Sequence, residues 1–446
     1  MLNELFTILT GIVFALVCGD YGITWDEGEK IHEDTSYLQI LRRIEPFDPL
    51  VVHIPGYFYV FDTREVPDLF EETMPEVFPE NAPGNFTWDE EMQKWVMTVF
   101  NHYQWDLNWS NPAVFVEMLD VLLFWANQGA DILRLDAVAF LWKKIGTTCQ
   151  NEREAHLILQ LLKDCCQVTA PGVLFIAEAI VAPVEVTKYF GEDAVIAKEC
   201  EIAYNATLMA LLWDAVATRS ARLLEQGIRS LPGKLDRATW LNYVRCHDDI
   251  GLAFDDADVA RAGFDPASHR AFLLDYFTGE FEGSSARGVP FARNEKSGDA
   301  RISGSLASLA GLEAALEAGD EAAIDHGIER ILLLHGMILS FGGIPLLYYG
   351  DEIGTLNDYS YLEDEAKAGD SRWIHRPEID WERAERRRRS GSVEQRIFDG
   401  LHFGLPCGEI QGRQSPLPIP VQDQGNQMVV PFGLEEGLLD DGPGSD

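Results

Sequence analysis

The stretch ILRLDAVAF, residues 132–140, is apolar enough for a buried strand but contains Arg134 and Asp136. Side chains alternate between the two faces of a strand, so these two charged side chains share one face. An unpaired charge is costly to bury. The two are therefore expected either to form a structural ion pair or to act together on a bound molecule.

Further ionisable residues lie near the ends of two other apolar stretches. They are Glu178 in VLFIAEA (173–179), and His247, Asp248 and Asp249 in TWLNYVRCHDDIG (239–251). Carboxyl groups brought together in this way can transfer protons to and from a substrate. Together with the imidazole they could instead hold a divalent metal ion, which is the alternative chemistry for these residue types.

The sequence alternates between predicted helices and strands from about residue 110, which favours parallel βα units. The predicted strands are 132–140, 173–179, 201–205, 239–251 and 344–354, and the predicted helices are 111–130, 152–169, 206–228 and 328–341. A long polar insertion is expected over about 252–318. The ionisable residues thus collect at the C-terminal ends of strands, where α/β barrels form their active sites.

The charge balance narrows the range of partners. The chain has 446 residues and a net charge of −38, from 35 Lys and Arg against 73 Asp and Glu. Such a surface repels nucleic acid and acidic lipid, so neither nucleic acid nor a membrane is expected as a partner, and a neutral substrate is favoured. Seven cysteines with no CxxC pair indicate reduced thiols and a cytoplasmic location. The apolar run 5–18 is short for a membrane helix and follows no basic segment; it leaves membrane association or export open.

Three of these stretches, ILRLDAVAF, FIAEAIV and NYVRCHDDIG, resemble signature regions of the α-amylase superfamily of retaining glycoside hydrolases (glycoside hydrolase family 13). NHYQWDLNWSNP, ARGVPFARN, SGDARISG and GTLNDYSYLEDEAKAGDSRWIHRP are more specifically similar to amylosucrases, over about residues 45–403. The resemblance implies an enzyme that cleaves sucrose, transfers the glucosyl group to an α-glucan and releases fructose. It implies no cofactor and no catalytic metal.

The resemblance also implies roles for the residues at the strand ends. Asp136 would be the nucleophile that forms a covalent glucosyl-enzyme, and Arg134 would keep it ionised and aimed. Glu178 would be the general acid, with a pKa raised by its apolar surroundings and by nearby anions. Asp248 would be the third catalytic carboxylate, which binds ring hydroxyls most strongly in the transition state, and His247 would donate a hydrogen bond to the same sugar.

Five further positions carry over from amylosucrases as substrate-binding residues. Phe100 and Gln104 would line the substrate pocket. Asp249 and Arg301 would contact the fructosyl or acceptor sugar. Arg372, in DSRWIHRP, would close the floor of the glucosyl pocket.

The expected fold is α/β, a partial (β/α)8 TIM-type barrel in which strands four to eight are recognisable, with insertions like domains B and B′. The expected divisions are 1–44, apolar and unassigned; 45–108, like part of domain B; 109–403, the barrel with the B′-like insertion 252–318; and 404–446, an acidic Pro/Gly-rich tail predicted to be disordered.

The family pattern is incomplete in this sequence. The first signature region, an Asp…Asn-His strand end, is absent upstream of residue 100, and so is the acid expected to pair with Arg372. The chain is therefore expected to be truncated at both ends. Two alternatives to the transferase follow: a hydrolase of sucrose or α-glucosides, and a non-catalytic remnant.

An open sheet of five parallel strands would expose an edge on each side and much apolar surface. We therefore expect the isolated chain to be marginally stable or prone to aggregate, with weak activity or none. A thermal melt with light scattering checks this expectation. A monomer that stays in solution and unfolds cooperatively would contradict it.

Overall fold

The computed structural model describes residues 56–403, apart from residues 81, 192–197, 232–235 and 295–297. The predictions for the apolar segment 1–44, including the run 5–18, and for the tail 404–446 lie outside the described residues. The five cysteines in the described part of the chain are all free thiols. No helix in that part is both long and apolar enough to cross a membrane.

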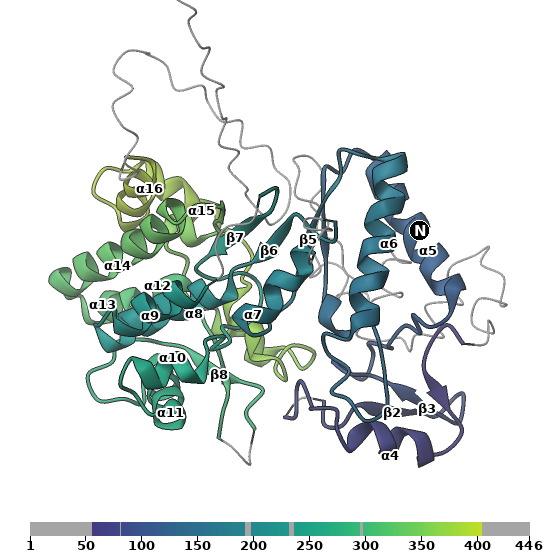
Figure 1. Cartoon of the computed structure of the whole chain (residues 1–446). Coiled ribbons are helices and arrows are strands. Elements are labelled where there is room, and N and C mark those ends of the chain that lie inside the picture. The colour runs from purple at the N-terminus through teal and green to yellow at the C-terminus, as the bar shows by residue number, and fades with distance from the viewer. Residues whose placement is uncertain (1–55, 81, 192–197, 232–235, 295–297, 404–446) are drawn as a thin grey trace, which may run out of the picture.

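A sheet of five parallel strands lies at the centre of the structure (Figure 1). Its strands are β4 (Ile132–Leu135), β5 (Leu174–Ala177), β6 (Ile202–Tyr204), β7 (Thr239–Tyr243) and β10 (Ile344–Leu346). The order is β10-β7-β6-β5-β4, and every neighbouring pair is parallel. All five predicted strands are confirmed, and so is the partial barrel. The strands are shorter than predicted, and β4 and β5 end immediately before Asp136 and Glu178.

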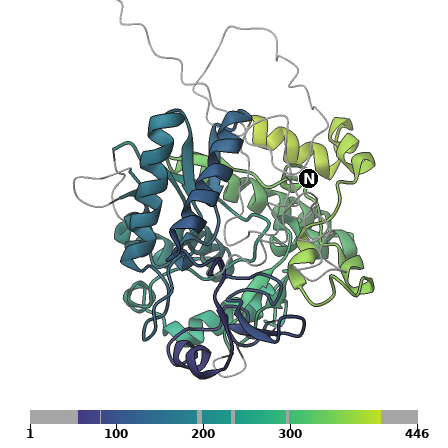
Figure 2. The same cartoon turned by 90° about the vertical axis from the view of Figure 1, so that its right-hand side faces the viewer.

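Helices cover the outside of this sheet (Figures 1 and 2). They include α5 (Pro112–Asn127), α6 (Arg153–Thr169), α8 (Ala206–Thr218), α9 (Arg222–Ser230) and α14 (Glu321–Ser340). The Asn111 side chain caps α5 by accepting a hydrogen bond from the Ala113 N–H, as its sequence predicts. The single helix predicted over 206–228 is wrong: Arg219 adopts a left-handed conformation, with φ 52°, which ends α8 and separates it from α9.

The alternation of side chains on β4 divides its residues between two environments. Leu133 and Leu135 are fully buried in a cluster that contains Met118 and Leu122 of α5 and Leu159 of α6. Because Arg134 points to the opposite face of the strand, it lies inside the barrel rather than beneath the helices. The apolar face of β4 therefore fixes the direction in which its charged residue points.

A small antiparallel unit precedes the barrel, at the foot of Figure 1. It contains β1 (Val60–Phe61), α4 (Glu65–Glu71), β2 (Phe86–Asp89) and β3 (Lys94–Met97), with strand order β1-β3-β2. Lys143 joins it to the barrel by a buried ion pair with Asp106, 2.6 Å long. The ring of Phe100 packs edge-on against Phe140, with centroids 5.1 Å apart.

The insertion after β7 is folded, and both of its halves contribute buried residues to the main core. It contains α10 (Asp256–Arg261), α11 (Pro266–Phe277), a hairpin of β8 (Val289–Phe291) and β9 (Arg301–Ser303), α12 (Leu306–Leu309) and α13 (Leu312–Ala318). Leu306, Ala307 and Leu312 are buried in the main core. A backbone bridge between Ile250 and Ile302 fastens β9 beside the residues that follow β7.

Short helices complete the described chain. They are η1 (Val138–Phe140), α7 (Pro183–Val186), η2 (Thr187–Phe190), η4 (Asp351–Ile353), η5 (Tyr359–Glu363), η6 (Ser371–His375), α15 (Trp381–Glu385), η7 (Arg386–Arg388) and the longer α16 (Val393–Phe403). Of these, η1 follows β4 after two residues, and η6 carries Arg372. Both helices therefore bear on the region at the C-terminal ends of the strands.

A buried ion pair ties α6 to the sheet. Lys163 lies 2.5 Å from Glu201 and donates a hydrogen bond to the Val173 carbonyl, while Glu201 accepts one from the Phe175 N–H. We expect Glu201→Ala to cost about 3–5 kcal/mol, because it leaves the Lys163 ammonium buried without a carboxylate.

The measurement is the melting temperature and yield of the purified variant. Arg229→Ala is the control, because it breaks an exposed ion pair with Glu225 and should cost less than about 1 kcal/mol. Equal melting temperatures for the two variants would contradict the importance given to the buried pair.

Candidate active site

Arg134 lies beneath the end of β4 and contacts two acids and a tyrosine. Its side chain is 3% exposed, and it pairs with Asp136 at 2.5 Å and with Asp248 at 3.7 Å. Its Nε donates a hydrogen bond to the Tyr204 hydroxyl at 3.1 Å. Arg134 is thus held by Tyr204 of β6, while its guanidinium group faces the carboxylates of Asp136 and Asp248. The structure contains the ion pair between Arg134 and Asp136 that was one of the two alternatives for these residues.

The turn after Asp136 brings a second carboxylate beside the first. Ala137 adopts a left-handed conformation, with φ 49°, which is uncommon for a residue other than glycine. In this conformation its backbone N–H donates to Glu178 Oε2 at 2.9 Å. Glu178 is itself fixed by backbone bonds to Leu135 and Val138. The carboxyl groups of Asp136 and Glu178 therefore stand at neighbouring strand ends on the same side of the sheet.

The two carboxyls differ in how strongly their charges are favoured. The pKa of Glu178 is raised to about 7, first by burial and then by the nearby anion of Asp136, with Arg134 opposing the shift. Burial also raises the pKa of Asp136, but there the Arg134 guanidinium opposes the shift directly. Glu178 is thus able to hold a proton near neutral pH while Asp136 is paired with a cation. Such an acid beside a carboxyl that is paired with a cation is suited to acid-assisted substitution at a sugar carbon.

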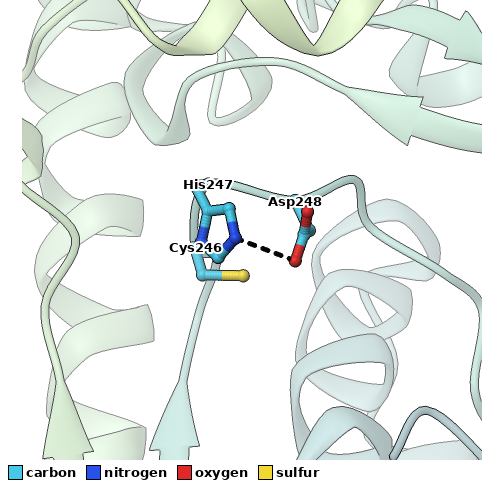
Figure 3. A group of neighbouring side chains, drawn as sticks. All are labelled: Cys246, His247 and Asp248. Atoms are coloured by element: carbon cyan, nitrogen blue, oxygen red, sulfur yellow. Dashed lines mark ion pairs between the residues drawn. The ribbon is translucent and has the colours of Figure 1, made fainter. Parts of the chain in front are cut away.

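Asp248 and His247 follow β7, and their side chains face each other (Figure 3). His247 Nε2 lies 3.2 Å from Asp248 Oδ2. Burial lowers the pKa of His247 to about 3, so its ring is neutral at physiological pH.

The charge of Asp248 is stabilised by its surroundings. Burial disfavours the charged form, yet the pKa of this carboxyl lies well below its ordinary value because cationic and polar groups surround it. These groups are His247 and the guanidinium groups of Arg134, Arg372 and Arg376, the three arginines lying 3.6–3.7 Å away. Asp248 therefore stays a carboxylate.

Cys246, His247 and Asp248 form a compact group whose potential ligand atoms lie within 4.8 Å of one another (Figure 3). The chemistry of this group does not suit a metal ion. A thiol binds metal as a thiolate, and burial raises the pKa of Cys246 to about 12. In addition, the guanidinium groups around Asp248 already neutralise its charge and would repel a cation.

Arg372 is held by an acid that the sequence analysis did not single out. Its Nε and NH2 groups bind both oxygens of Asp370, with a shortest distance of 2.5 Å. The Arg372 guanidinium also stacks near the rings of Phe78 and Phe291, at 5.3 and 4.6 Å from their centroids. Arg372 thus faces Asp248 from a rigid support.

Asp249 and Arg301 come together across the bridge between the segment after β7 and strand β9. The Arg301 Nε lies 3.6 Å from Asp249 Oδ2, and the guanidinium lies 5.6 Å from the centre of the Phe78 ring. Burial raises the pKa of Asp249, with Arg301 and Arg372 opposing the shift. The hairpin thus supplies a cation beside the strand-end acids.

Phe100 and Gln104 lie on the side of the small antiparallel unit. Phe100 packs against Phe78, with ring centroids 5.8 Å apart, and through it joins the group around Arg372. The side-chain carbonyl oxygen of Gln104 accepts hydrogen bonds from the backbone and side chain of Asn101. These bonds stabilise the turn from Asn101 to Gln104. The contacts described for Gln104 do not join it to the strand-end acids.

Contributors to this site that were not predicted from the sequence include Tyr204, Ala137, Asp370 and Arg376. Tyr204 ends a predicted strand as the charged residues do, and this position could have identified it. Asp370 and Arg376 lie in the same DSRWIHRP motif as Arg372. Nothing in the sequence indicates the backbone conformation of Ala137.

Carboxyls at the C-terminal ends of parallel strands lie where α/β barrels form their active sites. Residues 57–252 match the family model described as "Alpha amylase, catalytic domain". This part of the chain is therefore similar to that catalytic domain, and the sheet of five parallel strands has the fold of that domain.

Relatives that match the chain are named for different reactions. The chain is 28% identical over 397 residues to a glucosylglycerate phosphorylase of Spirochaeta thermophila, a match that covers 84% of this chain and 61% of the relative. It is 30% identical to a glucosylglycerate phosphorylase of Escherichia coli (69% of this chain, 51% of the relative) and to the trehalose synthase/amylase of Mycolicibacterium smegmatis (69% and 45%). The chain thus spans about half to three-fifths of the length of these relatives.

The fold is also found in a solved structure. The crystal structure of sucrose 6F-phosphate phosphorylase from Thermoanaerobacter thermosaccharolyticum matches with a TM-score of 0.56 at 19% sequence identity. The match covers 78% of this chain and 64% of that chain. At this level of identity it supports the barrel fold alone.

The pKa of Glu178 leads to a pH prediction. If Glu178 is the general acid, it must be protonated to act, and kcat/KM for cleavage of a glucoside should fall as pH rises through about 7. The measurement is kcat/KM as a function of pH for the wild type and for Glu178→Gln. A substrate such as α-glucosyl fluoride, whose leaving group needs little protonation, should show a weaker alkaline fall. An unchanged alkaline fall in Glu178→Gln would contradict the assignment.

Proposed function

We propose that this chain is an amylosucrase-like retaining glucosyltransferase, which cleaves sucrose and passes the glucosyl group to an α-glucan. The observation that carries the proposal is the contrast at the strand ends. Asp136 is paired with buried Arg134. Glu178 accepts a hydrogen bond from the backbone N–H of Ala137 and has a pKa near neutrality.

In the proposed first step, an Asp136 oxygen attacks the anomeric carbon of the glucosyl group. The bond from that carbon to the fructosyl oxygen breaks, and Glu178 gives its proton to the departing oxygen. Fructose leaves, and a covalent glucosyl-enzyme remains. Asp248 and His247 would bind ring hydroxyls, and the negative charge of Asp248 would favour the transition state, in which the sugar ring becomes positively charged.

In the proposed second step, Glu178 acts as a base. It takes the proton from a hydroxyl of the acceptor glucan as that oxygen attacks the anomeric carbon, and Asp136 leaves as a carboxylate. No cofactor is required, because the bond between the two anomeric carbons of sucrose supplies the driving force. Arg372 would form the floor of the glucosyl pocket, and Asp249 with Arg301 would meet the fructosyl or acceptor sugar. Phe100 and Gln104 would line the pocket from the small antiparallel unit.

The similarity to amylosucrases in the motifs around Phe100, Arg301 and Arg372 supports sucrose as the donor. The ion pair between Asp249 and Arg301 is consistent with a neutral acceptor, since it already balances the charge of Arg301. The part of the chain from residue 56 to 108 and the insertion 252–318 would frame the pocket as domains B and B′ do in the family.

The proposal is tested by replacing the nucleophile. We expect Asp136→Asn to reduce fructose release from sucrose by at least about 10⁴-fold, because the amide cannot form the glucosyl ester. Asp120→Asn, on α5 and away from the site, is the matched control. Fructose release that is unchanged in Asp136→Asn would place the activity elsewhere, and no release by the wild type would favour the non-catalytic remnant.

Transfer and hydrolysis are separated by the products of the same assay. We expect more free fructose than free glucose when glucan is present, because part of the glucosyl group is passed to the acceptor. Equal amounts of glucose and fructose at every glucan concentration would identify a hydrolase instead.

A second candidate is phosphorolysis, favoured by the glucosylglycerate phosphorylases among the relatives. In that reaction inorganic phosphate takes the place of the acceptor hydroxyl and yields glucosyl phosphate. Adding phosphate to the sucrose assay distinguishes the two. Glucosyl phosphate formation that exceeds glucan extension would favour the phosphorylase, and so would the same result with glucosylglycerate as donor.

A further inference from the structure

The carbonyl oxygen of His247 is held by two buried side chains that lie outside the set of predicted site residues. His375 Nε2 lies 2.9 Å from this oxygen, and Arg376 Nε donates to it at 2.7 Å. The side chain of Arg376 is fully buried, and His375 is 1% exposed. Both residues lie 128 or more positions further along the chain than His247, so only the fold brings them there.

We propose that His375 and Arg376 are positioning residues that clamp the backbone of His247 and thereby fix the orientation of the His247 ring and the Asp248 carboxylate. This inference rests on the proposed glucosyl transfer, because the role of the clamp is to hold groups that bind the sugar. Neither residue need touch the substrate.

The proton on His375 is determined by its neighbours. The Gly304 N–H donates to His375 Nδ1 at 3.0 Å, so this nitrogen must be the unprotonated acceptor. The proton of the neutral ring is then on Nε2, where it points at the His247 carbonyl. A second proton on Nδ1 would face the Gly304 N–H, so the geometry requires neutral His375. The burial that lowers the pKa of His375 well below its ordinary value agrees with this requirement.

The clamp is anchored on the segment that follows β10, the last strand of the sheet. Arg245, which follows β7, donates to the His375 carbonyl at 3.3 Å and binds Asp351 in η4 at 2.9 Å. Its guanidinium also lies over the Tyr348 ring, 4.4 Å from the centroid. A continuous set of buried contacts therefore runs from the end of β10 to the turn that carries Asp248.

Arg376 adds a charge to the same clamp. Its NH2 group lies 3.6 Å from Asp248 Oδ1, so one guanidinium binds the backbone of His247 and faces the side chain of Asp248. Loss of the clamp should displace both the His247 ring and the Asp248 carboxylate. Small misplacements of these groups weaken binding of the transition state more than binding of the substrate. The expected effect is therefore on kcat more than on KM.

Two substitutions of His375 distinguish a clamp from a merely buried residue. In His375→Gln the amide nitrogen can take the place of Nε2 and still donate to the His247 carbonyl. In His375→Asn the amide oxygen can take the place of Nδ1, but no donor reaches the carbonyl. His326→Asn, on the exposed surface of α14, is the control.

We expect His375→Asn to lower kcat by about 100-fold with little change in KM, and His375→Gln to restore most of the activity. Arg376→Met should lower kcat in the same way. The assay uses sucrose and, separately, α-glucosyl fluoride, and melting temperatures are recorded for every variant. Equal activity of the Asn and Gln variants at equal melting temperatures would overturn the proposal.

The substrates separate this inference from the proposed function. A wild type that turns over α-glucosyl fluoride but not sucrose would overturn sucrose as the donor, and the comparison of variants would still be decided on the fluoride. For a wild type inactive on both, calorimetric binding of deoxynojirimycin, an iminosugar shaped like glucose, replaces turnover. Weaker binding to His375→Asn than to His375→Gln supports the clamp, and equal binding overturns it.

Discussion

The buried guanidinium of Arg134 is the interaction on which the site depends. It contacts Asp136 and Asp248, from two different strand ends, and is itself supported by the Tyr204 hydroxyl. Without this cation, the carboxyls gathered at the ends of β4, β5 and β7 would repel one another. The apolar packing of Leu133 and Leu135 against the helices holds Arg134 in place, so the hydrophobic core and the electrostatics of the site are fixed by the same short strand.

The acids around this cation differ in their pKa values. Glu178 has one backbone N–H and an apolar strand beneath it, and its pKa is raised. Asp248 is surrounded by guanidinium groups, and its pKa is lowered. One fold thus keeps one carboxyl able to donate a proton and another permanently charged, which is the division of roles that acid-assisted glucosyl transfer requires.

The parts of the fold predicted correctly from the sequence were those encoded by neighbouring residues. Apolar runs gave the five strands, and the charged residues within them gave the strand ends. Strand lengths could not be predicted, because they depend on where the partner strands stop. The split between α8 and α9 was missed because Arg219, not a glycine, takes the left-handed conformation.

For the site, the catalytic candidates were visible because each lies in a specific motif. The groups that support them were harder to find. Tyr204 meets Arg134 from 70 positions away, and His375 meets His247 from 128 positions away, so neither pairing has a local signal. Asp370 was overlooked although it lies two residues before Arg372, because an acid so near an arginine is commonplace in a solvent-exposed loop.

The donor that Ala137 offers to Glu178 belongs to the main chain. No substitution short of proline can delete it, so natural variation at position 137 is free to alter the shape of the turn but not its polarity. Glycine would widen the range of conformations, and a β-branched side chain would resist the left-handed one. Selection at this position would therefore act on side-chain size, even though the group that meets the acid is an amide common to almost every residue.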